Sequence, residues 1–191
     1  VMLAVPSRSN VRQYKLLKKE TDELVGRING KYATVSWTPI WYFYRSLPFD
    51  NLIDLYTSSD VAMITPVRDG MNLVAKEYVA TRTDQTGVLI LSEMAGAAKE
   101  LNKALLVNPS DTEALADALK TALEMPLGEQ VSRNNSLQKR IRRYSVTRWA
   151  ESFMQALLKA HDQREPHTAK KIGSTTIQEM TAQFVDSKKR L

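Results

Sequence analysis

The sequence has 191 residues, no cysteine and only two histidines, and it lacks any apolar run near the roughly 18 residues of a membrane-spanning helix. Without cysteine there are no disulfides and no thiolate metal sites, which agrees with the cytoplasmic location that we expect. Both histidines, His161 and His167, follow the segments expected to form the sheet, so a Ser–His–Asp arrangement at strand ends is not expected. The sequence also lacks metal-ligand spacings and nucleotide-binding glycine motifs. We therefore expect no metal and no cofactor.

The charge and the start of the chain exclude further classes. The net charge is +6, but the basic residues are spread out except at 139–143 and 188–190, where no aromatics alternate with them. We expect neither nucleic acid nor a membrane as a partner. Residues 1–6 are too short for a signal peptide and are typical of a strand already under way, which predicts that the chain is part of a longer protein.

Short apolar runs alternate with segments of helical periodicity, which predicts an α/β fold with a doubly wound parallel sheet and C-terminal helices. Strands are expected at 1–5, 33–37, 61–65, 87–91 and 104–107. Helices are expected at 11–28, 48–58, from 72 onward, and at 114–123, 127–141 and 146–160, with a short one near 95–98. This pattern predicts one domain over residues 1–162 and a polar linker or tail over residues 163–191.

Helix boundaries are indicated by local signals. Ser9 or Asn10 is expected to cap the first helix, Asn29-Gly30 to end it, and Ser110 to open a later helix through a capping box with Glu113. The aromatic-rich stretch 37–44 is expected either in the core or on a docking surface for a partner domain.

The stretch 61–78 carries the functional signal. An apolar strand is ended by Pro66, Asp69-Gly70 makes a turn in which Gly70 is free to take φ > 0, and a helix follows from Asn72. The amides of residues 71–74 would then be the unsatisfied donors of a first helical turn, available to a phosphate or a sugar hydroxyl. A purely structural turn is the alternative. The small residues at 92–98 leave the same choice, between close packing and a ligand against the backbone.

Thr65 to Ala80 resembles the donor-site signature of the trehalose-6-phosphate synthases, a family of retaining glucosyltransferases. Residues 26–32, 37–39 and 95–98 also fit the family in order and spacing, so the resemblance covers about residues 1–160. It implies transfer of glucose from UDP-glucose to glucose 6-phosphate, with retention, in a cleft between two Rossmann-like domains. The chain then corresponds to most of the second, donor-binding domain.

The resemblance also implies roles for individual residues. Asp69 binds the hydroxyls of the donor glucose, and Arg8 reaches the phosphate of the acceptor, a task suited to a planar guanidinium. Glu77 binds the ribose hydroxyls. The backbone that holds the glucose and the diphosphate belongs to Gly70, Met71, Asn72, Leu73 and Val74. The uracil pocket is lined by Leu47, where the family more often has an aromatic, and by Leu52.

Several parts of the family's enzyme are expected to be missing. These are the N-terminal acceptor domain, the basic pair that clamps the diphosphate, and the strand that lies between 1–5 and 61–65. The sheet should then have a gap, a direct pairing of these two strands, or a strand from another chain. We expect the fragment alone to be inactive, and residues after about Gln163 resemble a connector to a phosphatase domain. A homo-oligomer is compatible with the sequence.

Two other readings remain open at this point. The chain could belong to another retaining nucleotide-sugar glucosyltransferase, or to a non-catalytic regulatory subunit of a trehalose synthase complex. The presence of both Asp69 and Glu77 argues against the regulatory subunit. The sequence does not distinguish UDP, GDP and ADP as the nucleotide.

Overall fold

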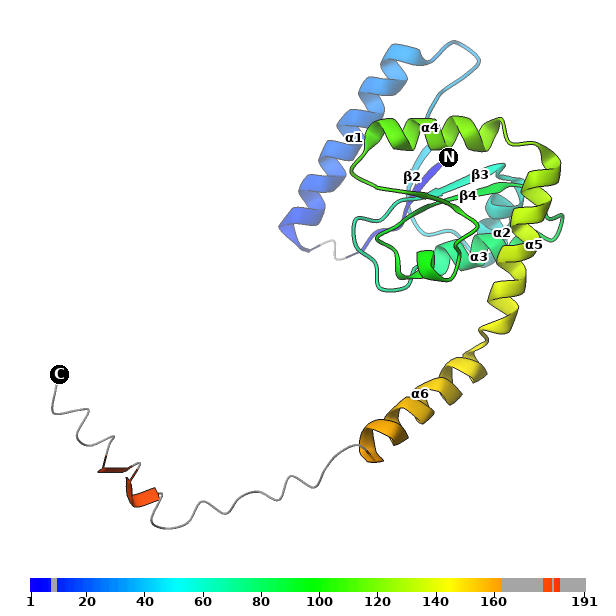
Figure 1. Cartoon of the computed structure of the whole chain (residues 1–191). Coiled ribbons are helices and arrows are strands. Elements are labelled where there is room, and N and C mark those ends of the chain that lie inside the picture. Colours follow the sequence, from blue (N-terminus) through cyan, green and yellow to red (C-terminus); the bar gives the residue numbers. More distant parts are fainter. Residues whose placement is uncertain (8–9, 163–176, 180, 183–191) are drawn as a thin grey trace. The chain divides into compact units, whose positions relative to one another are not determined.

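The computed structural model describes residues 1–7, 10–162, 177–179 and 181–182. The chain forms two compact units, residues 1–140 and 141–191. The elements of the first unit are β1 (Met2–Ala4), α1 (Arg12–Tyr32), β2 (Tyr42–Tyr44), α2 (Phe49–Ser58), β3 (Val61–Ile64), α3 (Leu73–Thr81), β4 (Val88–Ser92), the 3₁₀ helix η1 (Gly96–Lys99), β5 (Leu105–Val107) and α4 (Thr112–Leu123). Helix α5 (Leu127–Arg143) crosses the division, and α6 (Val146–Asp162) belongs to the second unit (Figure 1).

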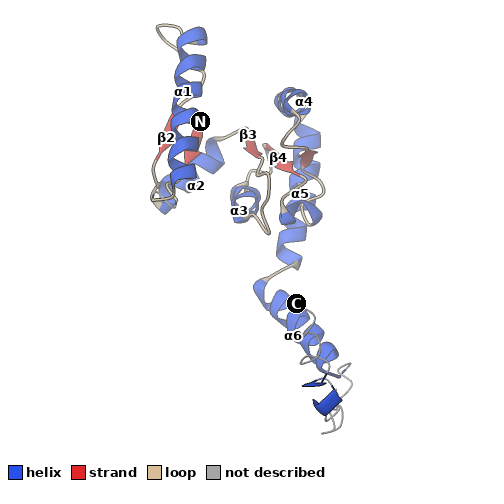
Figure 2. Ribbon diagram, turned by 90° about the vertical axis from the view of Figure 1, so that its left-hand side faces the viewer, coloured by secondary structure: helices blue, strands red, loops and turns tan. Residues whose placement is uncertain are grey.

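All strand pairs are parallel, which confirms the predicted α/β class with parallel strands. They form two sheets, β1–β2 and β3–β4–β5 (Figure 2). Val61 is in register with Val88, and Ile90 with Leu105. Strands β1 and β3 do not pair. Of the arrangements expected around an absent strand, direct pairing is therefore wrong, and the strands lie in two separate sheets.

Strand β4 is the centre of the three-stranded sheet, and all five of its residues are buried. Val88 and Ile90 join Val107, Ala122 and Met125 in one apolar cluster, so helix α4 covers this sheet. Helix α3 also packs on β3 and β4. A strand with a neighbour on each edge and helices against it has no solvent face, which explains why its sequence is apolar without alternation.

The prediction of a strand at 33–37 is wrong. Helix α1 continues through Asn29-Gly30 to Tyr32. The second strand is β2, which begins at Tyr42, five residues after position 37, where the expected strand ends. The Asn29 side chain accounts for this arrangement, because its amide donates to the Ile40 carbonyl at 2.9 Å and accepts from the Ile40 N–H at 3.0 Å. Asn29 therefore fixes the segment that leads into β2, instead of ending the helix.

Two of the expected caps are also corrected. Val11 is the N-cap of α1 and makes no side-chain cap, so Asn10 does not cap this helix, and Ser9 lies outside the described residues. Helix α4 is capped by Asp111, whose Oδ1 accepts from the Ala114 N–H at 3.0 Å, one residue later than the expected Ser110. Aspartate and serine cap equally well, so the sequence alone does not choose between adjacent residues.

The aromatic stretch 37–44 is only partly packed. Trp37 and Trp41 are 58% and 61% exposed, so the expectation that they lie in the core is wrong for this chain. The three residues of β2 are half-buried. The alternative, a docking surface, stays a prediction.

In the second unit, the predicted helix is confirmed as α6, and its apolar stripe is exposed. The rings of Trp149 and Phe153 stack on each other with centroids 5.6 Å apart. Among the described residues, no helix is long and apolar enough to cross a membrane. The expected boundary at 162/163 stays a prediction, since residues 163–176, 180 and 183–191 lie outside the described part.

The end of α2 is held by one buried arginine. Arg82 is 3% exposed and donates through Nη1 to the carbonyls of Ser59 at 3.1 Å and Tyr56 at 3.3 Å, and also to that of Thr57. Its Nε donates to the Thr86 carbonyl at 2.8 Å. The last carbonyls of a helix have no partners within the helix, and here a single guanidinium satisfies them.

Replacing Arg82 should therefore lower the stability of the first unit. Arg82→Met keeps most of the aliphatic stem but leaves these carbonyls without donors, which should lower the free energy of unfolding by about 3 kcal/mol or more. Urea denaturation followed by circular dichroism measures this. Arg27→Met, at an exposed position of α1, is the matched control and should change the value by about 0.5 kcal/mol at most. A loss for Arg82→Met no larger than that of the control would contradict the assignment.

Candidate functional site

The predicted strand–turn–helix over residues 61–78 is confirmed. Strand β3 ends at Ile64, a loop follows, and α3 begins at Leu73 with Asn72 as its N-cap. The loop lies beside the turn that follows β4, because Asp69 and Ala95 form a parallel bridge. The two loops that leave the carboxyl ends of neighbouring strands therefore meet, where open α/β sheets bind ligands.

These two loops are joined through their backbones. The Gly96 N–H donates to the Asp69 carbonyl at 2.9 Å, and the Ala97 N–H donates to the Met71 carbonyl at 2.7 Å. A Cβ on Gly96 would lie 2.1 Å from the Gly70 carbonyl oxygen, so no other residue fits there without a shift of the loop. Close packing of one loop on the other thus explains the glycine at position 96, and a ligand against this stretch stays a prediction.

Gly70 does not use the positive φ that a glycine can adopt. Its φ is not positive, and a Cβ there would meet nothing within 4 Å. Asn72 takes the positive φ instead, at +75°. Asparagine adopts this region more readily than most residues, because its short amide can bond locally.

The side chains of Asp69 and Asn72 build the turn. Asp69 Oδ1 accepts from the Met71 N–H at 2.9 Å, and Asp69 Oδ2 accepts from Asn72 Nδ2 at 3.0 Å. Asn72 Oδ1 accepts from the Ala75 N–H at 2.9 Å and so caps α3. These three hydrogen bonds span residues 69–75, and two of them hold the Asp69 carboxylate in one orientation.

The set of free amides in the structure is therefore smaller than the predicted one. The Met71 N–H is bonded to Asp69, which corrects the expectation that all four amides of 71–74 are open. Within the described part of the chain, the N–H groups of Asn72, Leu73 and Val74 have no partner. Leu73 and Val74 are 58% and 44% exposed, so an anion or a hydroxyl can reach this helix end.

Glu77 lies one helical turn further along α3 and is exposed. Its Oε2 accepts a hydrogen bond from the Tyr56 hydroxyl of α2 at 3.1 Å. Glu77 and Tyr56 line a cavity of about 310 Å³, whose other lining residues come from β1, α2, β3, α3 and positions next to them. The cavity also contains two other predicted donor-site residues, Leu52 and Val74. The structure thus brings Leu52, Val74 and Glu77 together.

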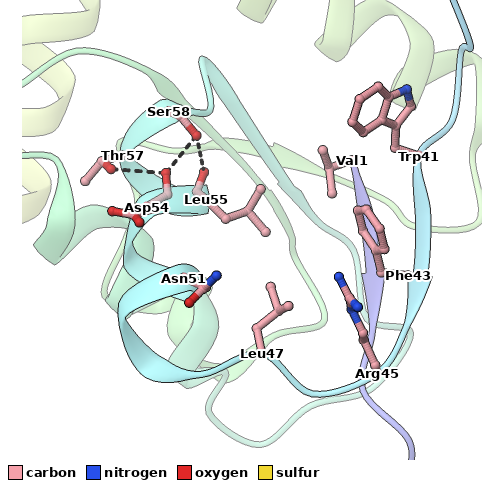
Figure 3. A pocket seen from close by; sticks show the side chains of 10 residues that line it. All are labelled: Val1, Trp41, Phe43, Arg45, Leu47, Asn51, Asp54, Leu55, Thr57 and Ser58. Carbon is pink, nitrogen blue, oxygen red and sulfur yellow. Dashed lines mark hydrogen bonds between the residues drawn. The ribbon is translucent and has the colours of Figure 1, made fainter.

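Leu47 lines a different cavity, of about 550 Å³, between β2 and α2 (Figure 3). Val1 and Leu55 border both cavities, so the two are neighbours. Leu47 lies there with Phe43 and Arg45, and the Arg45 guanidinium lies over the Phe43 ring at 5.0 Å. The two leucines predicted for one base pocket therefore lie in adjacent cavities. Arg8, the predicted acceptor residue, lies outside the described residues.

One contributor to the site, Tyr56, was not predicted from the sequence. Burial, and after it the hydrogen bond to Glu77, raises the pKa of Tyr56 to about 12, and burial raises the pKa of Tyr78 to about 12. The signal for Tyr56 was its place four residues after Leu52, which puts both on one face of α2. Gly96 belongs to the small residues at 92–98 that the sequence does single out, and its proximity to Gly70 shows why a glycine is needed there.

A parallel α/β domain with open amides at a loop–helix junction and a carboxylate on each side is typical of nucleotide-binding domains. The chain belongs to glycosyltransferase family 20, whose family model matches residues 1–159.

The relatives agree with this family. The chain is 44% identical, over its whole length, to the bifunctional trehalose-6-phosphate synthase/phosphatase of Thermoproteus tenax, of which it covers 26%. It is 48% identical over 86% of its length to the UDP-forming alpha,alpha-trehalose-phosphate synthase of Candida albicans, of which it covers 34%. The chain therefore spans about a quarter to a third of the curated relatives it matches.

Solved structures show the same fold. The UDP-forming synthase from Burkholderia xenovorans, in complex with glucose-6-phosphate, aligns with a TM-score of 0.78 and 41% identity over 82% of this chain and 34% of that chain. A structure from E. coli bound with UDP-2-fluoro glucose aligns with a TM-score of 0.78 and 43% identity, over 81% of this chain and 35% of that chain.

The contact between the loops predicts a strong effect of a single methyl group. Gly96→Ala should displace residues 69–71 and lower the free energy of unfolding by about 1–3 kcal/mol, as overpacking does. Thermal or urea unfolding measures the change. Gly70→Ala is the matched control, because its Cβ enters open space and its φ is not positive. Equal stability of the two variants would show that the loops are not held by this approach.

Proposed function

We propose that this chain is the donor-binding part of a trehalose-6-phosphate synthase, which transfers glucose from UDP-glucose to glucose 6-phosphate with retention in trehalose biosynthesis. The observation that carries the proposal is the junction at Asn72. Three amides without a partner among the described residues lie there between Asp69 and Glu77, in a chain of glycosyltransferase family 20. The relatives named as UDP-forming synthases support the choice of donor.

The sugar and the diphosphate of the donor would bind at the start of α3. We assign the amides of Asn72, Leu73 and Val74 to the diphosphate and the glucose, where the helix dipole adds about 0.3–1 kcal/mol. Gly70 and Met71 contribute as the backbone that brings Asp69 to the sugar. Each oxygen of Asp69 already accepts one hydrogen bond and retains a second lone pair, so the carboxylate can still accept from a glucose hydroxyl.

The nucleoside would bind beside α2. Glu77 is assigned to the ribose hydroxyls, which a carboxylate binds by charge-assisted hydrogen bonds. Leu52, in the same cavity as Glu77, is assigned to the base. Leu47 is assigned to the far side of the base, across the boundary between the two cavities that share Leu55.

The acceptor and the remaining parts of the enzyme would come from outside this chain. Glucose 6-phosphate would be held by Arg8 together with an N-terminal acceptor domain, and a phosphatase domain would follow, as in the bifunctional relative. The Burkholderia structure with glucose-6-phosphate supports this acceptor. We propose that the reaction uses no cofactor or metal bound by this chain, and that the protein is cytoplasmic.

Nucleotide binding tests the assignment of Glu77. Glu77→Ala should weaken the binding of UDP to this chain by about tenfold or more, since one charge-assisted hydrogen bond contributes about 1.5–3 kcal/mol. Isothermal titration calorimetry gives the dissociation constants. Glu113→Ala, an exposed acid in the first turn of α4, is the control and should bind UDP as the unaltered chain does. Unchanged affinity in Glu77→Ala would refute the donor site.

A second test concerns catalysis by the chain alone. Because the acceptor domain would lie outside it, the purified chain should transfer no glucose from UDP-glucose to glucose 6-phosphate. Formation of trehalose 6-phosphate, followed by mass spectrometry, would contradict the proposal that this chain supplies only the donor half. Addition of the N-terminal part of a family member as a separate polypeptide is the positive arm of the experiment.

A further inference from the structure

The Tyr56 hydroxyl is the one described group that donates a hydrogen bond to the Glu77 carboxylate. It lies 3.1 Å from Oε2, while Oε1 has no partner among the described residues. Both side chains border the cavity of about 310 Å³ that also contains Leu52. We infer that Tyr56 is a positioning residue, which orients the Glu77 carboxylate so that it selects nucleotides with a vicinal diol on the ribose. This inference rests on the proposed role of Glu77 in nucleotide binding.

Tyr56 can position another group because it is itself fixed at two points. Its ring meets that of Tyr78 edge to face, with centroids 6.4 Å apart and an angle of 85° between the planes. Its carbonyl accepts from Arg82 Nη1 at 3.3 Å. Tyr78 and Arg82 are 1% and 3% exposed. The ring of Tyr56 is therefore supported by Tyr78, and its backbone by Arg82.

Tyr78 is held in turn by the backbone of the segment after α2. Its hydroxyl donates to the Ser59 carbonyl at 3.2 Å. The ring of Tyr56 therefore rests on a side chain whose own position is set by a hydrogen bond. Without Tyr56, Glu77 would be an exposed carboxylate on a flexible stem, and ordering it on binding would cost side-chain entropy.

The Tyr56 hydroxyl stays protonated and can donate to Glu77 at any pH near neutrality. The pKa of Tyr56 is raised to about 12, first by burial and then by the hydrogen bond to Glu77, so the hydroxyl keeps its proton throughout the neutral and mildly alkaline range. With the phenol on Oε2, the carboxylate offers both lone pairs of Oε1 and one of Oε2. The two adjacent hydroxyls of a ribose can donate hydrogen bonds to these lone pairs, whereas a sugar without the hydroxyls cannot.

The experiment removes the hydroxyl and keeps the ring. Tyr56→Phe, Glu77→Ala and the double variant are titrated with UDP and with 2′,3′-dideoxyuridine diphosphate, which lacks both ribose hydroxyls. Tyr56→Phe should weaken UDP binding about three- to tenfold, the range expected of one hydrogen bond, and leave binding of the dideoxy nucleotide unchanged. In the Glu77→Ala background, Tyr56→Phe should have no further effect. Tyr32→Phe, at an exposed tyrosine at the end of α1, is the control.

The outcomes separate the two claims. If Tyr56→Phe weakens both nucleotides equally, or lowers affinity further in Glu77→Ala, its role is structural and the inference is overturned. If Glu77→Ala weakens UDP binding but Tyr56→Phe does not, the donor site stands and the positioning role is wrong. If Glu77→Ala leaves UDP binding unchanged, both the donor site and the inference are refuted.

Discussion

The site depends on the approach of two strand-end loops at Gly70 and Gly96. Each loop leaves a parallel strand at its carboxyl end, and two backbone hydrogen bonds join them where no side chain fits between. This contact places Asp69 beside Ala95 and sets where the chain turns into α3. The direction of the open amides is therefore decided by packing between loops, and the helix alone would not fix it.

Within that frame, the polar side chains of the loop have structural roles besides the proposed functional ones. The side chains of Asp69 and Asn72 are hydrogen-bonded to each other. Asp69 also accepts from the Met71 N–H in the loop, and Asn72 accepts from the Ala75 N–H in the first turn of α3. Asn72 also adopts a backbone conformation that most residues avoid, and such conformations persist where the surroundings determine them fully. A loop arranged before any ligand arrives loses little conformational freedom on binding, so more of the interaction energy is retained as affinity.

Much of this fold could be predicted from local patterns in the sequence. Strand β4 is recognisable because a strand covered on both faces must be apolar throughout. The start of α3 is predicted to within one residue, since the helix expected from Asn72 begins at Leu73 with Asn72 as its N-cap. The errors fall where a distant residue decides. The position of β2 is set by the bond from Asn29 to Ile40, and the reason for Gly96 is the carbonyl of Gly70. Residues that act through another element, as Tyr56 does, leave almost no trace in the periodicity of their own helix.

The guanidinium at the end of α2 has a consequence for motion. By holding the carbonyls of residues 56, 57 and 59, Arg82 joins α2 to the turn after α3, and the phenol–carboxylate bond joins the same helices a turn earlier. A change in the angle between α2 and α3 would therefore break hydrogen bonds at two places. Strand β1 is not paired with β3, and the cavity of about 310 Å³ is lined by residues of both strands. The part of its lining that α2 and α3 supply is therefore restrained at two places, whereas no strand pairing crosses from β1 to β3 among the described residues.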